Sequence, residues 1–298
     1  MSDQWRVQFD AMVTFQNGGR LSVEDFRLDI PGTEIEEDAL AELLVRQLGL
    51  LMVNEVQILR KRAIREAHKG SRGVFLPRAR RIVELNHPIR NGMVTYPGLP
   101  GPEISEYLTR EASRSRYAPG TEFHIGRVSM VANTGTYLDT PFHRFSDGID
   151  LSGMPIESLA DLEGVVLRVP GGDVRAVDRD LLLPLEVRGR AVLVHTGWAR
   201  HFGTAQYATG APFLTRRASE WLAAEGAALV GIDSINIDDM ADGSRPAHTV
   251  LLAARIPIVE HLCGLEHLPP TGFRFHAAPP RVADMGTFPV RAYAVIEG

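Results

Sequence analysis

An aspartate and a histidine four residues apart form the most informative spacing in the sequence. Asp139 and His143 lie in the segment 133–143, where Gly135 and Pro141 are expected to bend the backbone. A carboxylate oxygen and an imidazole nitrogen presented by such a bend can converge on one cation, and both suit zinc or manganese. Taken alone, such a pair is more often a turn cap or a surface group than a metal site.

The segment 133–143 resembles the signature His-x-Gly-Thr-His-x-Asp-x-Pro-x-His of the cyclase family of metal-dependent hydrolases, which includes bacterial kynurenine formamidase and isatin hydrolase. Three further segments resemble this family in the family's order, so the resemblance runs from about residue 81 to the C-terminus. They are Asn86-His87-Pro88-Ile89 followed by Tyr96-Pro97-Gly98, then Val194-His195-Thr196-Gly197-Trp198, and then Gly231-Ile232-Asp233-Ser234. Several ordered motifs are far more specific than one.

The resemblance also implies the rest of the metal site. In the family, a histidine in the last third of the chain and a glutamate twelve residues later complete it, and His248 and Glu260 stand at that separation. We expect His248 on a helix and Glu260 on the following strand, with residues 253–257 as the turn. With Asp139 and His143 this set gives two imidazoles and two carboxylates for a divalent ion, zinc or manganese. His143 or Glu260 could instead lie beside the ion as a general base.

The sequence departs from the family at two positions. Asn133 and Tyr137 replace the first and second histidines of the signature, which in two-metal members help to hold the other ion. An amide or a phenol is a poor substitute for imidazole, so we expect one ion rather than two. Asn133 and Tyr137 could instead donate hydrogen bonds to the substrate or to the developing oxyanion. His261 follows Glu260 directly, and strand alternation predicts that it points away from the ion.

The function implied is hydrolysis of a small-molecule amide, lactam or ester by metal-activated water, with His143, Glu260, Tyr137 and Asn133 as candidate catalytic residues. Two alternatives remain open. One is a lyase or cyclising dehydratase that uses the same ion as a Lewis acid. The other is a non-catalytic binding or assembly protein that has lost part of the metal site. The resemblance further implies a swivelling β/β/α fold and a homo-oligomer, a dimer or a tetramer.

The elements before the resemblance form a small unit of their own. Apolar residues alternate from Trp5 to Phe15, which predicts a strand, and the segment 17–19 and the residues to Ile30 predict its hairpin partner. Thr33 and Glu36 suit a capping box for a helix whose apolar face ends at Gly49, and a further strand completes a ββαβ unit.

The chain beyond this unit predicts an α/β domain with mixed strand directions. Basic residues with interspersed glycine and proline between residues 60 and 81 indicate a linker, so we predict a small α+β domain over residues 1–72 and a cyclase-like domain over residues 73–298. A basic patch for an anionic partner is the less favoured interpretation of that segment.

Composition narrows the kind of partner. The 298 residues are 44% hydrophobic and 23% charged, with a net charge of −5, so neither nucleic acid nor a membrane surface is an expected partner. No apolar run approaches the roughly 20 residues of a membrane-spanning helix, and Cys263 is the single cysteine. These features favour a cytoplasmic protein that acts on a small molecule.

Overall fold

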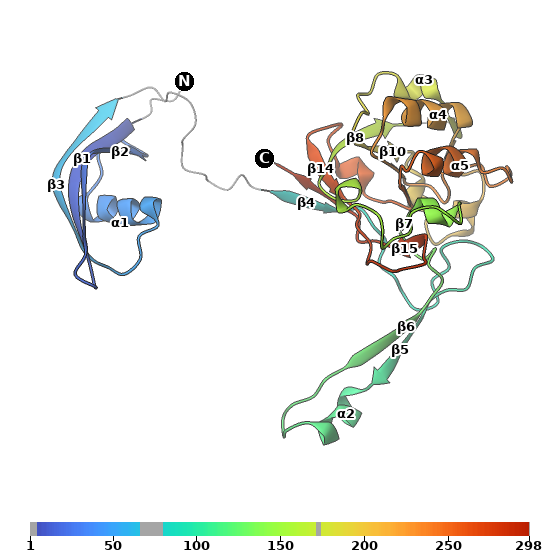
Figure 1. Ribbon diagram of the computed structural model, residues 1–298, viewed down its shortest axis with the longest axis horizontal. Helices are drawn as coiled ribbons and strands as arrows, with labels where there is room; N and C mark the ends of the chain where they lie inside the picture. Colours follow the sequence, from blue (N-terminus) through green and yellow to red (C-terminus); the bar gives the residue numbers. More distant parts are fainter. Residues whose placement is uncertain (1–4, 66–79, 171–173, 298) are drawn as a thin grey trace. The chain divides into compact units, whose positions relative to one another are not determined.

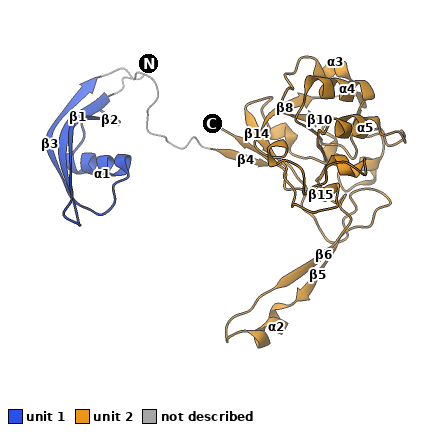
Figure 2. Ribbon diagram, in the orientation of Figure 1, with its two compact units in different colours: residues 1–78 blue, residues 79–298 orange. Residues whose placement is uncertain are grey.

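The computed structural model describes residues 5–65, 80–170 and 174–297, and the chain divides into two compact units, residues 1–78 and 79–298 (Figure 2). The predicted domain boundary between residues 72 and 73 lies outside the described residues.

Unit 1 is a three-stranded antiparallel sheet with one helix packed on it. Strands β1 (Trp5–Phe15), β2 (Arg20–Ile30) and β3 (Val53–Arg65) pair in the order β2-β1-β3, and helix α1 (Glu37–Leu48) lies between β2 and β3 in the chain. The alternate apolar residues of β1 are buried against Leu40 and Leu44 of α1. The predicted ββαβ order and the helix end at Gly49, which is left-handed with φ 62°, are confirmed.

The capping box predicted for α1 was wrong. Glu36 occupies the N-cap, three residues later than Thr33, and its side chain makes no capping hydrogen bond within the described chain. Because the helix starts later than predicted, the reciprocal pair between Thr33 and Glu36 cannot form.

The predicted linker at residues 60–81 was wrong at its beginning. Residues 60–65 continue β3, where Arg60 is paired in register with Asp10 of β1. Its guanidinium lies 2.9 Å from a carboxylate oxygen of Asp10 and 2.8 Å from one of Asp25. Residues 60–65 therefore belong to the sheet, with acidic partners facing Arg60, and residues 66–79 of the predicted linker lie outside the described residues.

Unit 2 is built on a mixed sheet, which in the described part of the chain has nine strands in the order β15-β7-β13-β12-β10-β8-β14-β16-β4 (Figure 1). The central strands are parallel, and their neighbours on both sides are antiparallel, which confirms the predicted mixed strand directions. In chain order the sheet strands are β4 (Arg81–Glu84), β7 (Tyr137–Asp139), β8 (Leu162–Arg168), β10 (Ala191–His195), β12 (Leu229–Ile232), β13 (Ile258–Glu260), β14 (Phe273–His276), β15 (Thr287–Pro289) and β16 (Tyr293–Ile296).

Helices α3 (Arg179–Leu182), α4 (Arg216–Glu225) and α5 (Pro246–Ala253) follow strands of this unit, and β9 (Ala176–Val177) pairs with β11 (Phe213–Leu214) beside them. Alternation along β10 divides the core in two. Val192 and Val194 pack with buried residues of α4 and α5, whereas Ala191 and Leu193 pack with residues of β14 and β16. Strands buried on both faces explain the continuous apolar runs of the sequence.

A buried carboxylate joins the ends of the central strands β10 and β12. The carboxylate of Asp233, just after β12, accepts hydrogen bonds from the backbone amides of Thr196 and Gly197, each at 2.8 Å, and from the Thr196 hydroxyl at 2.6 Å. Two of the segments that resemble the cyclase family thus contact each other. Their contact joins the carboxyl ends of β10 and β12, where the chain leaves the sheet.

A hairpin projects from the body of unit 2. Strands β5 (Glu103–Leu108) and β6 (Ile125–Ser129) pair antiparallel, with the short helix α2 (Arg110–Ser113) near their tip (Figure 1). The sequence patterns did not predict this arm.

None of the helices in the described residues is long and apolar enough to cross a membrane. The cytoplasmic location stays a prediction.

Candidate metal centre

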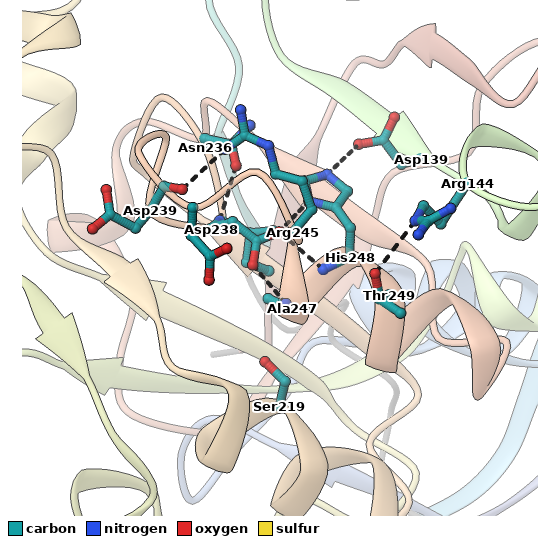
Figure 3. Close-up of polar contacts among 12 residues, drawn as sticks. Asp139, Arg144, Ser219, Asn236, Asp238, Asp239, Arg245, Ala247, His248 and Thr249 are labelled. Carbon is teal, nitrogen blue, oxygen red and sulfur yellow. Dashed lines mark hydrogen bonds and ion pairs between the residues drawn. The ribbon is translucent and has the colours of Figure 1, made fainter.

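Three of the four predicted metal ligands gather at one place in unit 2. Asp139 ends β7, His143 ends the short 3₁₀ helix of residues 141–143, and His248 lies on α5. Each offers one ligand atom, and these atoms lie within 4.8 Å of one another. Nδ1 of His143 is 3.7 Å from Oδ1 of Asp139. Nε2 of His248 is 3.7 Å from Oδ2 of Asp139 (Figure 3).

The Asp139 carboxylate is the buried centre of this cluster, because it has no exposed surface. Oδ1 accepts a hydrogen bond from the Thr287 hydroxyl. Oδ2 has no hydrogen-bond partner among the described residues. A buried carboxylate oxygen without a donor is costly, and a cation between it and the two imidazoles would satisfy it. The donor set therefore fits a divalent metal ion.

The register of three strands sets the contacts of Asp139 and Tyr137. Strand β7 lies between β13 and β15, so that Asp139 pairs with Thr287 and Tyr137 pairs with Glu260. Both pairs are also side-chain hydrogen bonds. A shift of one residue in either pairing would turn these side chains to opposite faces of the sheet. The strand register therefore determines which side chains meet at the site.

Two glycines allow the turn after Asp139 to pack closely. A Cβ on Gly286 would lie 2.2 Å from the backbone nitrogen of His143, and one on Gly148 would lie 2.5 Å from the carbonyl carbon of Pro141. The Gly286 carbonyl also accepts a hydrogen bond from the Thr140 amide at 2.7 Å. Any side chain at Gly286 would displace His143 from Asp139.

Asp238 orients His248. Its carboxylate lies 2.7 Å from Nδ1 of His248 and accepts hydrogen bonds from the backbone amides of Ala247 and His248 at 2.5 and 3.1 Å (Figure 3). Nε2 of His248 is thereby directed toward Asp139. Burial works to lower the pKa of His248, but the nearby Asp139 carboxylate, the hydrogen bond to Asp238 and the charge of Glu260 outweigh burial and raise the pKa to about 10.

Glu260 lies at the edge of the three-residue cluster. Its Oε1 is 3.6 Å from Nε2 of His248 and accepts a hydrogen bond from the Ile237 amide at 2.6 Å. Its Oε2 accepts one from the Tyr137 hydroxyl at 2.7 Å. Burial, together with the negative charge of Asp139, raises the pKa of Glu260 to about 7, although the charge of His248 opposes the rise. Glu260 can therefore exchange a proton near neutral pH.

Tyr137, which replaces the second histidine of the signature, contacts Glu260, and Asn133, which replaces the first, neighbours Tyr137. Burial and the charges of Glu260 and Asp139 raise the pKa of Tyr137 well above its usual value, so its phenol stays protonated and donates to Glu260. A hydrogen bond with Asn133 opposes this rise. Tyr137 therefore acts as a hydrogen-bond donor to Glu260 in this structure.

A chain of hydrogen bonds continues behind Tyr137. The imidazole of His261 lies between two phenols, with Nε2 3.2 Å from the Tyr137 oxygen and Nδ1 3.0 Å from the Tyr207 oxygen. Because the Tyr137 proton goes to Glu260, Nε2 of His261 donates to Tyr137, and Nδ1 can then accept from Tyr207. This requires a neutral imidazole, and burial lowers the pKa of His261 to about 3.

The premise that strand alternation turns His261 away from the ion was wrong. Strand β13 ends at Glu260, and His261 has a left-handed backbone with φ 57°, so strand alternation does not continue to it. His261 contacts the same Tyr137 hydroxyl that Glu260 contacts, but it lies outside the cluster of possible metal ligands.

A pocket of about 260 Å³ opens onto the cluster. Its lining brings together aromatic, amide and charged side chains: Tyr96, Leu99, Asn133, Tyr137, His143, Arg144, Asn236, Arg245, His248 and Glu260. A small molecule in this pocket would contact five of the six predicted site residues, with the sixth, Asp139, buried beside His143 and His248.

Comparison with known proteins identifies the family. A family model described as "Putative cyclase" matches residues 83–239, more than half of the chain. The chain belongs to this cyclase family. The kynurenine formamidases of Bacillus cytotoxicus and Bacillus cereus are 26% and 24% identical to it, and each alignment covers 70% of this chain and 95% of the relative.

Solved structures share the fold of this cyclase-family protein. Isatin hydrolase A from Labrenzia aggregata, bound to benzyl benzoate, matches with a TM-score of 0.64 at 22% identity, over 74% of this chain and 95% of that chain. An isatin hydrolase bound to the product analogue thioisatinate matches with a TM-score of 0.64 at 20% identity, over 75% and 95%. The predicted fold class is confirmed. The predicted enzyme class, a metal-dependent hydrolase, is confirmed by the family and its relatives.

Sequence reasoning missed several residues of the cyclase-family site. Asp238, Gly286 and Thr287 reach it through strand register and a helix start that spacing alone does not reveal. The signal available for Thr287 was only a glycine before a short apolar run, which many turns share. The roles of Asp139, His143, His248 and Glu260 as ligands stay a prediction.

Replacement of Asp238 tests the orientation of His248. We expect Asp238→Asn to weaken zinc or manganese binding by about 10–100-fold, because the neutral amide no longer fixes and polarises the imidazole. Calorimetric titration of the metal into the full chain measures this affinity. Asp239→Asn is the matched control, since that carboxylate does not contact His248. Equal affinities in the two variants would contradict the assignment.

Acid should destabilise unit 2 through His261. The ordinary histidine pKa is 6.5 and the folded value is about 3, so below pH 6.5 the unfolded chain takes up a proton that the folded chain refuses. The free energy of unfolding should therefore fall as pH drops from 6.5 toward 4, by up to about 1.4 kcal/mol per pH unit for this group. Urea unfolding at several pH values should show a shallower decline in His261→Gln than in the exposed control His267→Gln, and identical slopes would refute the neutral assignment.

Proposed function

We propose that the protein hydrolyses an amide C–N bond of a small molecule with one bound divalent ion, zinc or manganese. The observation that carries this proposal is the buried Asp139 carboxylate, which has one oxygen without a donor and lies 3.7 Å from each of two imidazoles beside an open pocket. The relatives named kynurenine formamidase and isatin hydrolase support an amide or lactam as the substrate class.

Asp139, His143 and His248 would hold the ion, which when bound supplies Lewis acidity toward a carbonyl oxygen and toward water. Thr287 supports two of these ligands, since its hydroxyl donates to Asp139 and lies 2.7 Å from Nδ1 of His143. Because Nδ1 of His143 is engaged by Thr287, Nε2 is the nitrogen that this pocket-lining histidine would offer to the ion.

Glu260 is the group that we favour as the proton acceptor. It lies outside the set of three converging ligand atoms, and both its oxygens already accept hydrogen bonds from the protein. Its raised pKa, about 7, suits a general base that later returns the proton. In the reaction the oxygen of water forms a bond to the carbonyl carbon, the C–N bond breaks, and the proton held at Glu260 goes to the leaving nitrogen.

One ion rather than two is supported by Tyr137. The Tyr137 hydroxyl is committed to Glu260 and His261 and stays protonated, so it offers no ligand atom to a second cation. The donors around Asp139 therefore serve a single position.

Oxygen-18 water separates hydrolysis from the lyase alternative. We expect the zinc- or manganese-loaded protein to convert formanilide to aniline and formate that carries one solvent oxygen, and to lose this activity when a chelator removes the metal. Asp139→Asn should lower turnover by about 10²–10³-fold, because the buried ligand charge is lost. Asp147→Asn, an exposed aspartate near the same loop, is the control.

Two results would exclude hydrolysis. Product without solvent oxygen would indicate a lyase, and binding of less than about a tenth of an equivalent of metal would indicate a non-catalytic protein.

The arm of unit 2 supports a homo-oligomer. It exposes apolar side chains in cross-strand pairs, as at Ile104 and Val128, which are 43% and 54% exposed, and Tyr107 is 72% exposed. A two-stranded ribbon has too little core to bury them itself. A second copy of the chain is the partner that the family resemblance implies.

Light scattering on the eluting protein tests this assembly. We expect the full chain to form a dimer or tetramer and Ile104→Glu to shift it toward the monomer, because a buried carboxylate would face the partner. Ile156→Glu places the same change at an isoleucine that is 56% exposed outside the arm. The arm has no role in assembly if both variants keep the wild-type mass.

A further inference from the structure

Two arginines line the pocket that opens onto the candidate metal centre. Arg144 follows His143 directly, and Arg245 stands immediately before the first residue of α5. In Figure 3 their guanidinium groups lie to either side of His248. Neither arginine has a role in the proposed hydrolysis so far.

Arg144 is held in place without an ion pair. Its Nε donates to the Thr249 hydroxyl at 3.3 Å, and its guanidinium lies 5.3 Å from the centre of the Phe145 ring. No carboxylate of the described residues lies within 4 Å of its nitrogens. The side chain is exposed, so its charge remains available to a ligand in the pocket.

Arg245 is positioned at some cost in backbone energy. Its φ of 47° and ψ of 61° are left-handed, which costs a residue with a side chain about 1 kcal/mol or more. Nη1 donates to the Asp239 carbonyl at 3.0 Å, which uses one of five donors. In the described chain this guanidinium too has no carboxylate within 4 Å. The half-buried side chain therefore directs unused donors toward the pocket.

The charge of the pocket lining favours an anion. Among the described residues, Glu260 is the single acidic residue in the lining, against two arginines, and a divalent ion on Asp139 would add positive charge. Guanidinium groups match carboxylates in shape as well as in charge, because they donate parallel hydrogen bonds. Tyr96 and Leu99 supply apolar surface in the same pocket for the body of a ligand.

We propose that the substrate carries a carboxylate near the scissile amide and that Arg144 and Arg245 bind this carboxylate. The proposal rests on the proposed amide hydrolysis for the identity of the reacting bond, but the anion site itself stands on the two arginines. It makes Arg144 and Arg245 specificity-determining residues, which discriminate substrates by the charge beside the reacting carbonyl.

A series of aryl formamides tests the specificity. Formanilide is neutral, whereas 2-, 3- and 4-formamidobenzoate carry a carboxylate at increasing distance from the same amide. We expect the metal-loaded protein to prefer at least one of the three acids over formanilide by about 10-fold or more in kcat/KM, because charge-assisted hydrogen bonds bind the acid. In Arg144→Gln with Arg245→Gln this preference should fall to about 1, whereas Arg188→Gln, outside the pocket, should keep it.

Binding of benzoate gives a readout that does not need turnover. Calorimetric titration of benzoate into the zinc-loaded and the metal-free full chain should show affinity at least about 10-fold weaker in the double glutamine variant than in wild type. Lysine at both positions should restore part of that affinity, because the charge returns without the planar donors. Benzamide, which is neutral, should bind equally weakly to wild type and to the glutamine variant.

The outcomes separate the two proposals. Hydrolysis of formanilide without preference for any acid, together with benzoate binding that ignores both arginines, would overturn the carboxylate site and leave amide hydrolysis standing. Arginine-dependent benzoate binding without hydrolysis of any formamide would support the anion site and overturn the proposed reaction.

Discussion

The burial of one carboxylate, that of Asp139, is the constraint on which the site depends. A carboxylate without solvent is unstable unless opposite charges and donors surround it. Burial works to raise the pKa of Asp139, but the charges of His143 and His248 and the hydrogen bond from Thr287 outweigh it and lower the pKa. One oxygen still lacks a donor. The fold therefore keeps one buried carboxylate oxygen without a partner, and a bound cation would supply that partner.

The residues around Asp139 come from elements that are far apart in the sequence. Strand β7 places Asp139 between two neighbouring strands, β15 supplies Thr287, and the start of α5 supplies His248 with Asp238 beneath it. Gly286 lies immediately before β15, and its backbone is so close to that of His143 that a residue with a side chain would not fit there. The contacts of the centre are therefore consequences of sheet register and backbone packing, and each local element carries only one part of it.

This dependence explains how far the sequence could go. Period-two and helical patterns predicted the ββαβ unit. His248 was predicted on a helix and Glu260 on the strand after it, with a turn between them, and the structure has this order. These features could be predicted because they are local. Asp238 lies ten residues before His248 on a loop, and no period connects the two. Thr287 reaches Asp139 through antiparallel pairing between strands 148 residues apart, which composition cannot encode. The strand-alternation argument for His261 failed because the strand ends one residue before it, and strand ends are the least predictable feature of a pattern.

Tyr137, one of the two positions that depart from the signature, lies in a hydrogen-bonded network. A phenol at residue 137 cannot replace an imidazole as a ligand unless it loses its proton, and its surroundings of Glu260 and Asp139 oppose that loss. The proton instead bridges Tyr137 and Glu260, and His261 and Tyr207 extend the chain in one direction of donation. Each member is satisfied only while His261 is neutral and Tyr137 is protonated. A hydrogen-bonded network thus occupies the side of Glu260 away from His248. The carboxylate oxygen of Asp139 that has no donor lies outside this network and is left to bind a cation.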